Sequence, residues 1–296
     1  MAVIDGSSEE LKNLDTPSVD TSSAVDADEE RIARRKKIEE VAKWLLPLTV
    51  MAIAIWFWDR IVVWNDIPHF ILPRPGLVME TLWADREILV SALWITLKIT
   101  GLALLVAVVG GVGLAVLFAQ SRFAEMSFSP FAVILQVTPI VSIAPLIFIY
   151  IDSRLVGLLL CAWIVAFFPI LANTTLGLKS ADHNLRDLMT IYKASRWQRL
   201  IYLQLPSALP YFLGGLKIAG GLALIGAVVA EYVAGSGGLG SGLAFRILEA
   251  SYRLNIPRMF AALILIATTG VLIYAATSLI SHLALRKWHE SALKRE

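Results

Sequence analysis

The sequence predicts an all-α polytopic membrane protein with about six transmembrane helices. Of its 296 residues, 57% are hydrophobic and only 17% are charged, and the mean hydropathy is +0.70. The apolar residues gather in runs of about 20 or more, and a helix of that length crosses about 30 Å of hydrocarbon. An outer-membrane barrel would instead show short segments of alternating polarity.

Charge and cysteine content exclude further classes of protein. The formal net charge of +2 is too small for a nucleic-acid-binding protein, so we expect no nucleic acid partner. The single cysteine, Cys161, lies within an apolar run and supports neither a disulfide framework nor a cysteine-rich metal site. We therefore expect no metal site in this chain.

The N-terminal part of the chain differs from the rest. Residues 1–30 are acidic and rich in Ser and Thr, with too few apolar residues to form a core, so we expect a disordered tail. The first apolar run begins only near Trp44, too late for a cleavable signal peptide. Residues 31–43 between them are basic and should remain in the cytoplasm.

The transmembrane domain is expected to cover residues 44–285. Its six predicted spans cover residues 44–64, 91–119, 128–150, 154–178, 206–234 and 258–285. Sixteen Lys and Arg residues then fall on the side of the N-terminal tail and seven on the opposite side. The positive-inside rule therefore predicts a cytoplasmic N-terminus and a cytoplasmic tail over residues 286–296.

Prolines interrupt two of these spans. Pro139 and Pro145 lie in the third span and Pro169 in the fourth, where they free carbonyl groups that only protein or water can satisfy. The bent helices are either packing elements or the wall of a substrate path. Four neutral polar residues near the bends could offer hydrogen bonds to a solute, or could bond their own helix backbone: Thr138, Ser142, Asn173 and Thr174.

Glu231 is the ionisable residue of most interest, because it lies near the outer end of the fifth span, beside the glycine-rich run 235–242. A charged group within a span is a functional candidate. Three interpretations remain open: a structural or gating role through pairing with a cation such as Arg246, contact with substrate, or an interfacial position. A carboxylate is a poor ligand for an anionic substrate.

The 179–205 loop between the fourth and fifth spans is patterned. Leu185, Leu188, Met189 and Tyr192 recur at helical spacing and predict a first short helix with one apolar face. Ser195 is followed three residues later by Gln198, which is the spacing of a capping box and predicts a second helix. The next span should start at Leu205–Pro206. The helix pair either docks on a partner protein or lies on the membrane surface.

The same loop resembles the cytoplasmic signature of the permease subunits of binding-protein-dependent ABC importers. That signature reads Glu-Ala-Ala, three residues, Gly, nine residues, Ile-x-Leu-Pro, and this sequence keeps the spacing with five departures. Asp187 stands at the glutamate and Lys193 at the glycine, where lysine lacks the freedom of glycine to adopt a positive φ. The resemblance implies an ATPase-coupling set: Asp187, Leu188, Met189, Lys193, Ala194, Ser195, Leu203, Leu205 and Pro206.

Three further segments narrow the resemblance to a branch of that family. Leu72–Pro75, Phe167–Leu171 followed by Asn173–Thr175, and Ile225–Tyr232 followed by Gly235–Gly240 are similar to the nitrate, sulfonate, taurine and bicarbonate permeases. This implies the fold of a type I ABC importer permease and a small, anionic solute. Permeases for thiamine precursors, riboflavin and aromatic acids share much of the pattern and are the alternative.

The resemblance also implies partners and a location. They are a second permease copy, forming a homodimer, two cytoplasmic ABC ATPase subunits and a periplasmic or lipid-anchored substrate-binding protein, in the bacterial inner membrane. The chain has no Gly-x4-Gly-Lys-[Ser/Thr] motif, so ATP and Mg are expected on the ATPase and no cofactor on this chain.

Other functional classes find little support. Ser281–His282 and His289–Glu290 have no third partner for a catalytic triad, so we expect no catalytic residues and no enzyme activity in this chain. An ion-coupled secondary transporter would show an internal repeat and an ion site near the membrane midplane. A purely structural membrane subunit would leave the patterned loop without a role.

Overall fold

A computed structural model of the chain describes residues 21–235 and 240–286. Contacts divide the chain into two units, residues 1–61 and residues 62–296, which are described separately. The described residues form helices and turns without a strand, which confirms the all-α prediction. The helices are α1 (Thr21–Trp64), α2 (Pro75–Ala84), α3 (Arg86–Gln120), α4 (Arg122–Val137), α5 (Ile140–Tyr150), α6 (Arg154–Lys179), α7 (His183–Ile191), α8 (Arg196–Arg199), the π-helical η1 (Leu200–Gln204), α9 (Leu205–Ala234), α10 (Leu243–Tyr252) and α11 (Ile256–Leu285).

The first unit consists mainly of the long helix α1. Its part Val41–Trp64 is long and apolar enough to cross a membrane. The helix begins at Thr21, so the expected disorder of residues 1–30 is wrong for residues 21–30, while residues 1–20 lie outside the described part. Ala, Glu, Arg and Lys dominate the following residues 31–43 and favour helix, and extending that helix toward Thr21 avoids the cost of a new nucleus.

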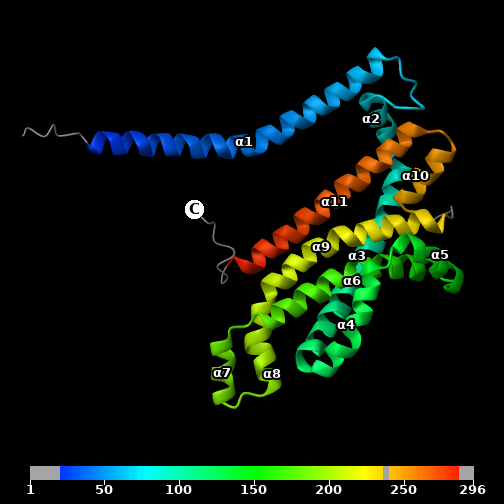
Figure 1. Cartoon of the computed structure of the whole chain (residues 1–296). Coiled ribbons are helices and arrows are strands. Elements are labelled where there is room, and N and C mark those ends of the chain that lie inside the picture. The colour runs from blue at the N-terminus through cyan, green and yellow to red at the C-terminus, as the bar shows by residue number, and fades with distance from the viewer. Residues whose placement is uncertain (1–20, 236–239, 287–296) are drawn as a thin grey trace, which may run out of the picture. The chain divides into compact units, whose positions relative to one another are not determined.

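The second unit has α3, α6 and α9 at its centre, packed side by side (Figure 1). Glycines allow the helix backbones to approach closely. Such close packing is expected in a membrane, where the hydrophobic effect does not drive helices together. A Cβ atom at Gly177 of α6 would lie 2.7 Å from the Cα atom of Ala208 on α9. A Cβ atom at Gly226 of α9 would lie 2.8 Å from the Cα atom of Ala162 on α6. These glycines therefore define the α6–α9 contact.

Among residues 21–235 and 240–286, five helices are long and apolar enough to span a membrane, and the sixth predicted span is broken. The predicted interruption of the third span is confirmed at Pro139, where α4 and α5 meet at an angle of 103°. It is not observed at Pro145, which lies inside α5. The break falls at Thr138 and Pro139, which both have extended backbones. A residue before proline is disfavoured in the helical region, so α4 ends there. The total of six holds when the bent pair counts as one span.

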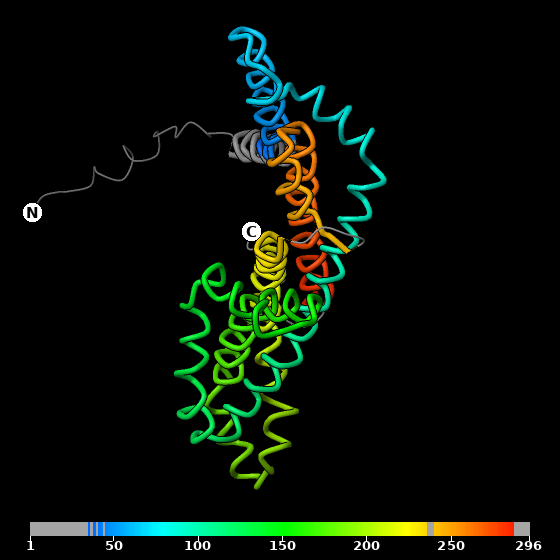
Figure 2. Tube along the Cα trace, turned by 90° about the vertical axis from the view of Figure 1, so that its right-hand side faces the viewer, coloured from blue at the N-terminus to red at the C-terminus, as the bar shows by residue number. Residues whose placement is uncertain are grey.

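The two ends of the second unit carry different short helices. α7 and α8 lie beyond one end of the α6–α9 pair, and α2 and α10 lie toward the opposite end, as both Figure 1 and Figure 2 show. α11 packs on α9, α10 and α2. The 179–205 loop and the outer part of α9 near Glu231 are thus at opposite ends of this unit.

Candidate functional site

The 179–205 loop contains the two short helices that the sequence predicts. Asp182 caps α7, because its Oδ1 accepts hydrogen bonds from the backbone N of Asn184 at 2.7 Å and of Leu185 at 3.3 Å. The predicted capping box of α8 is also present. The backbone N of Gln198 donates to Ser195 Oγ at 3.2 Å, and the backbone N of Ser195 donates to Gln198 Oε1 at 2.7 Å.

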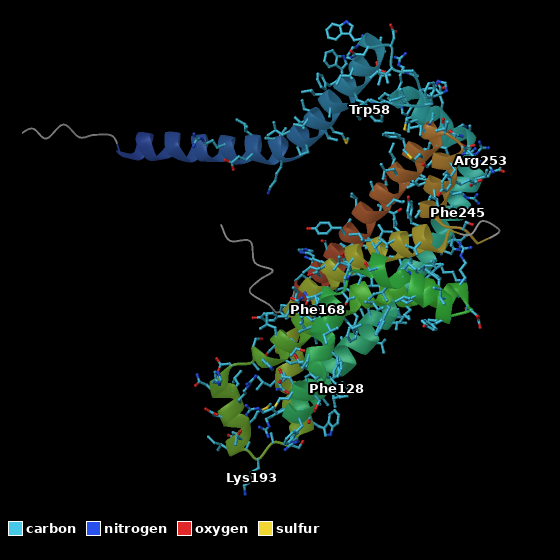
Figure 3. The ribbon with its side chains drawn as sticks, turned by 45° about the vertical axis from the view of Figure 1, so that its right-hand side comes forward. Trp58, Phe128, Phe168, Lys193, Phe245 and Arg253 are labelled. Carbon is cyan, nitrogen blue, oxygen red and sulfur yellow. The ribbon has the colours of Figure 1, made fainter. Side chains whose placement is uncertain are left out.

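The turn between these helices depends on Lys193, which has a φ of +53°. Its backbone N donates to Thr190 O, and the backbone N of Ala194 donates to Met189 O. These two bonds form a Schellman motif, in which the left-handed residue is most often glycine. Lys193 therefore adopts the conformation for which the family signature has glycine. Its side chain points away from the loop at the tip (Figure 3).

The described part of the chain leaves the apolar face of α7 uncovered. Leu185 and Leu188 are each 48% exposed, Ile191 and Tyr192 are each 76% exposed, and no residue of α7 is buried. Exposed apolar side chains that gather on one helix indicate an interaction surface. Asp187 is exposed on the same helix, as are Lys193 and Ser195 in the turn that follows.

The coupling set predicted from the sequence divides into two groups. Met189 and Ala194 are half-buried in the helix pair. Leu203 belongs instead to the interior of the chain, with 7% exposure, and Leu205 and Pro206 lie in the helix that follows. The structure therefore brings together the residues from 187 to 195 as a surface, while the later residues anchor that surface to the spans.

α9 begins at Leu205 with Pro206 in its first turn, as predicted. The sequence did not predict that α8 continues into α9 through η1. The three elements form one helix from Arg196 to Ala234. The backbone N of Leu205 donates to Leu200 O, the five-residue spacing of a π turn. Pro206 has no amide hydrogen, and its ring would press on the carbonyl of Tyr202 in an α-helix. The π turn accommodates the proline without ending the helix.

Glu231 holds three helices together near the opposite end of the unit. Its side chain is fully buried. Oε1 accepts a hydrogen bond from Thr96 Oγ1 of α3 at 2.8 Å, and Oε2 accepts one from the backbone N of Ala244 of α10 at 3.1 Å. Thr96 Oγ1 also accepts from the backbone N of Leu243 at 2.9 Å. Two of the free amides at the start of α10 are therefore capped by side chains of α3 and α9.

This arrangement, called the Glu231 clasp below, comprises Thr96, Glu231 and residues Gly242 to Ala244. The clasp also explains why residue 242 is a glycine, because a Cβ atom there would lie 2.0 Å from Glu231 Oε1. α10 continues from the clasp through Phe245, which is labelled in Figure 3. Residues 236–239 of the glycine-rich run lie outside the described part.

Two of the interpretations of Glu231 are corrected by these contacts. The pairing with Arg246 is wrong, since Arg246 Nη1 binds Glu249 Oε2 at 2.8 Å on the same helix. The carboxyl group of Glu231 instead accepts hydrogen bonds from Thr96 Oγ1 and from the backbone N of Ala244. The interfacial position is wrong as well, because the side chain is fully buried. Sequence reasoning missed Thr96 and Gly242. Their only signal was a threonine and a glycine within apolar surroundings.

The four neutral polar candidates do not form one site. Thr138 Oγ1 donates to Ile134 O at 2.6 Å, and Asn173 Nδ2 donates to Pro169 O at 2.8 Å, so both bond their own helix. Ser142 is exposed on α5. Thr174 is buried, and its Oγ1 has no hydrogen-bond partner among the described residues. Of the two interpretations, the bond to the own helix is the one observed for Thr138 and Asn173.

The bend between α4 and α5 nevertheless encloses a cavity of about 320 Å³. It is lined by Thr138 and Pro139 at the bend, by Phe168 and Pro169 of α6, and by Leu222 of α9, among others. Phe168 is labelled in Figure 3. The break at Pro139 and the proline inside the continuous helix α6 thus meet at one cavity, so the predicted interruption of the fourth span is not observed. Backbone carbonyls near such prolines can offer acceptors to a solute.

Comparison with known proteins gives consistent relatives. Residues 107–287 match the family described as "Binding-protein-dependent transport system inner membrane component". The chain is 30% identical to a "Probable ABC transporter permease protein" of Haemophilus influenzae, over 80% of this chain and 96% of the relative. It is 34% identical to the riboflavin transport system permease protein RibX of Chloroflexus aurantiacus, over 83% of this chain and 90% of the relative. It is 26% identical to the putative aliphatic sulfonates transport permease protein SsuC of Bacillus subtilis, over 87% of this chain and 92% of the relative.

A solved structure shows the same fold. A chain of the crystal structure of an amino acid ABC transporter with histidines aligns with a TM-score of 0.55 at 20% identity, covering 68% of this chain and 96% of that chain. The broken third span, the paired-helix loop and the family match agree with one another. The chain therefore belongs to the inner membrane components of binding-protein-dependent transport systems, the permease subunits of ABC importers.

Proposed function

We propose that this chain, together with a second copy of itself, forms the translocation path of an ATP-driven importer in the bacterial inner membrane. Two ABC ATPases bind the 179–205 loop on the cytoplasmic side and carry ATP and Mg, and a binding protein delivers the solute from the other side. Both termini of the chain are cytoplasmic. The single observation that carries the proposal is the uncovered apolar face of α7 at the family's signature positions.

The helix pair has the properties of a protein-docking surface. Leu188 supplies apolar area that gains free energy when a partner covers it, while Asp187 beside it supplies charge that orients the partner. The Schellman turn at Lys193 and the capping box at Ser195 hold both helices in place before docking, which lowers the entropy cost of binding. Because α8 is continuous with α9, a partner that moves the loop also moves a span.

The solute is proposed to be small and anionic. Similarity to SsuC, named as an aliphatic sulfonates permease, supports this class. The cavity of about 320 Å³ at the α4–α5 bend is the region of this chain where the solute would pass. A riboflavin-like solute is the second candidate, since the identity to RibX is higher. Uptake of labelled nitrate, taurine and riboflavin by the reconstituted complex separates the two.

The docking proposal is tested by Leu188→Asp combined with Met189→Asp. The two new carboxylates would be buried without partners when the ATPase covers the apolar face of α7. Burying them should weaken binding by several kcal/mol, on the order of the penalty for burying unpaired polar groups. We expect the spans to insert normally, while the ATPase no longer co-purifies or hydrolyses ATP without uptake. Transport that survives ATP depletion but stops with an uncoupler would instead identify an ion-coupled carrier.

A matched control adds the same two charges elsewhere on α7. His183 and Asn184 are exposed in its first turn, where acidic residues suit the helix dipole. His183→Asp combined with Asn184→Asp should retain ATPase binding and uptake. If the Leu188 and Met189 variant also retained both at the wild-type level, the loop would not be the ATPase contact, and the proposed mechanism would be wrong.

A further inference from the structure

A cavity lined by arginines lies at the base of the 179–205 loop. Its volume is about 340 Å³, and its lining residues are Ala119, Gln120, Arg186, Arg196, Arg199, Leu203 and Gln204. The share of one liquid water is about 30 Å³, so the space holds a phosphate group with several waters. Three guanidinium groups border it, and no acidic side chain is among the lining residues. We call it the arginine cavity.

The arginines are incompletely satisfied within the chain. Arg186 Nη2 donates to Leu178 O at 3.3 Å and to Lys179 O at 2.8 Å, which fixes the side chain at the end of α6. The Nε atoms of Arg186 and Arg199 are buried, and neither has a hydrogen-bond partner among the described residues. Buried donors are normally paired. Guanidinium groups bind phosphate oxygens well, because their planar forks match them.

An apolar groove borders the same helices directly beyond the arginine cavity. It has a volume of about 530 Å³, and its lining is Val108, Val109, Val112 and Gly113 of α3, Thr174 of α6, and Leu205, Ala208, Leu209 and Phe212 of α9. Gln204 lines the arginine cavity, and Ala208, four residues later on the same face of the helix, lines the groove, so the two spaces follow one another along this helix. On α3, Gly113 and Ala119 are six residues apart, about 9 Å along the axis.

We infer that the two spaces together bind one anionic phospholipid, with its phosphate in the arginine cavity and an acyl chain in the apolar groove. The arginine cavity lies at the end of the spans, where the charged headgroup of such a lipid would lie. The apolar groove lies along the spans, where its acyl chain would lie. Basic pockets between helices at a membrane surface are suited to anionic headgroups. Free phosphate would use the cavity alone and would leave the groove without an occupant.

The test reconstitutes the complete transporter in nanodiscs of phosphatidylcholine containing one-fifth phosphatidylglycerol, then extracts it in detergent and measures the phosphatidylglycerol retained per permease by mass spectrometry. Arg196→Gln combined with Arg199→Gln removes two charges and should lower retention about tenfold. Arg122→Gln, on an exposed residue outside the cavity, should leave retention unchanged.

The groove is tested separately with Gly113→Leu. A Cβ atom at Gly113 meets nothing within 4 Å, so the larger side chain enters the groove without disturbing α3, and retention should fall several-fold. Gly101→Leu, on the same helix with equally open surroundings but outside the groove, is the control. Sensitivity to the arginine variants alone would show a free-anion site and overturn the lipid assignment. Unchanged retention in the arginine variant, or loss of the ATPase instead of lipid, would overturn it too.

Discussion

The Glu231 clasp predicts a large and specific effect of one methyl group at Gly242. Gly242 precedes α10 with φ −82° and ψ −174°, a conformation that alanine adopts without strain. The backbone therefore gives no reason for glycine at this position. The reason is contact, since the new Cβ atom would lie 2.0 Å from Oε1, 2.1 Å from Cδ and 2.2 Å from Oε2 of Glu231.

The size of the effect follows from what must move. Ordinary contacts begin near 3.4 Å, so the carboxyl group or the start of α10 must shift by more than 1 Å. Such a shift breaks the hydrogen bonds from Thr96 Oγ1 and from the backbone N of Ala244. Each buried bond that is lost costs about 1–3 kcal/mol, which gives roughly 2–6 kcal/mol for Gly242→Ala.

Thermal unfolding of the purified complex measures this effect, and the loss should lower the midpoint by on the order of 10 °C. Gly240→Ala is the matched control, because it adds the same methyl group two residues earlier, where nothing lies within 4 Å. Uptake should fall in step with stability for Gly242→Ala and remain normal for Gly240→Ala. Equal melting temperatures for the two variants would refute the reasoning about the clasp.

Two other variants test neighbouring parts of the argument. Glu231→Gln keeps the volume but turns an NH2 group toward one of the two donors, so stability should fall by about 1–3 kcal/mol, and uptake should drop more than assembly with the ATPase; wild-type uptake would contradict a role in transport. Lys193→Gly removes a left-handed strain of about 1–2 kcal/mol, against about 0.5–1 kcal/mol for the flexibility of glycine, so the melting temperature should rise slightly. Ala194→Gly, one residue later, should lower it.

The parts of the structure that follow from local spacing could be read from the sequence. The prediction of the capping box depends only on Ser195 and Gln198, which are three residues apart. The prediction of α7 depends only on apolar residues that recur at helical spacing. In each case the physical cause lies within one or two helical turns of the chain. The left-handed turn was not predicted, because lysine stands where the family has glycine; Lys193 nevertheless adopts a φ of +53°.

The parts that depend on contacts between distant residues could not be read in this way. Thr96 is 135 residues from Glu231, and nothing near either residue indicates the pairing. Arg246 was the cation suggested as the partner of Glu231, but it pairs with Glu249 on its own helix. The break at Pro139 was visible as a proline, whereas the 103° angle is set by the packing of α4 and α5 against the rest of the unit.

The uninterrupted helix from Arg196 to Ala234 has a mechanical consequence. Its 39 residues extend about 58 Å, with the π turn near one end and Glu231 about 40 Å beyond that turn. A tilt of about 10° at the turn would sweep the far end through roughly 7 Å, a distance that the hydrogen bonds around Glu231 cannot follow. The stiffness of five residues, Leu200 to Gln204, thus sets how much of a force applied at α8 reaches the opposite side of the membrane and how much is absorbed on the way.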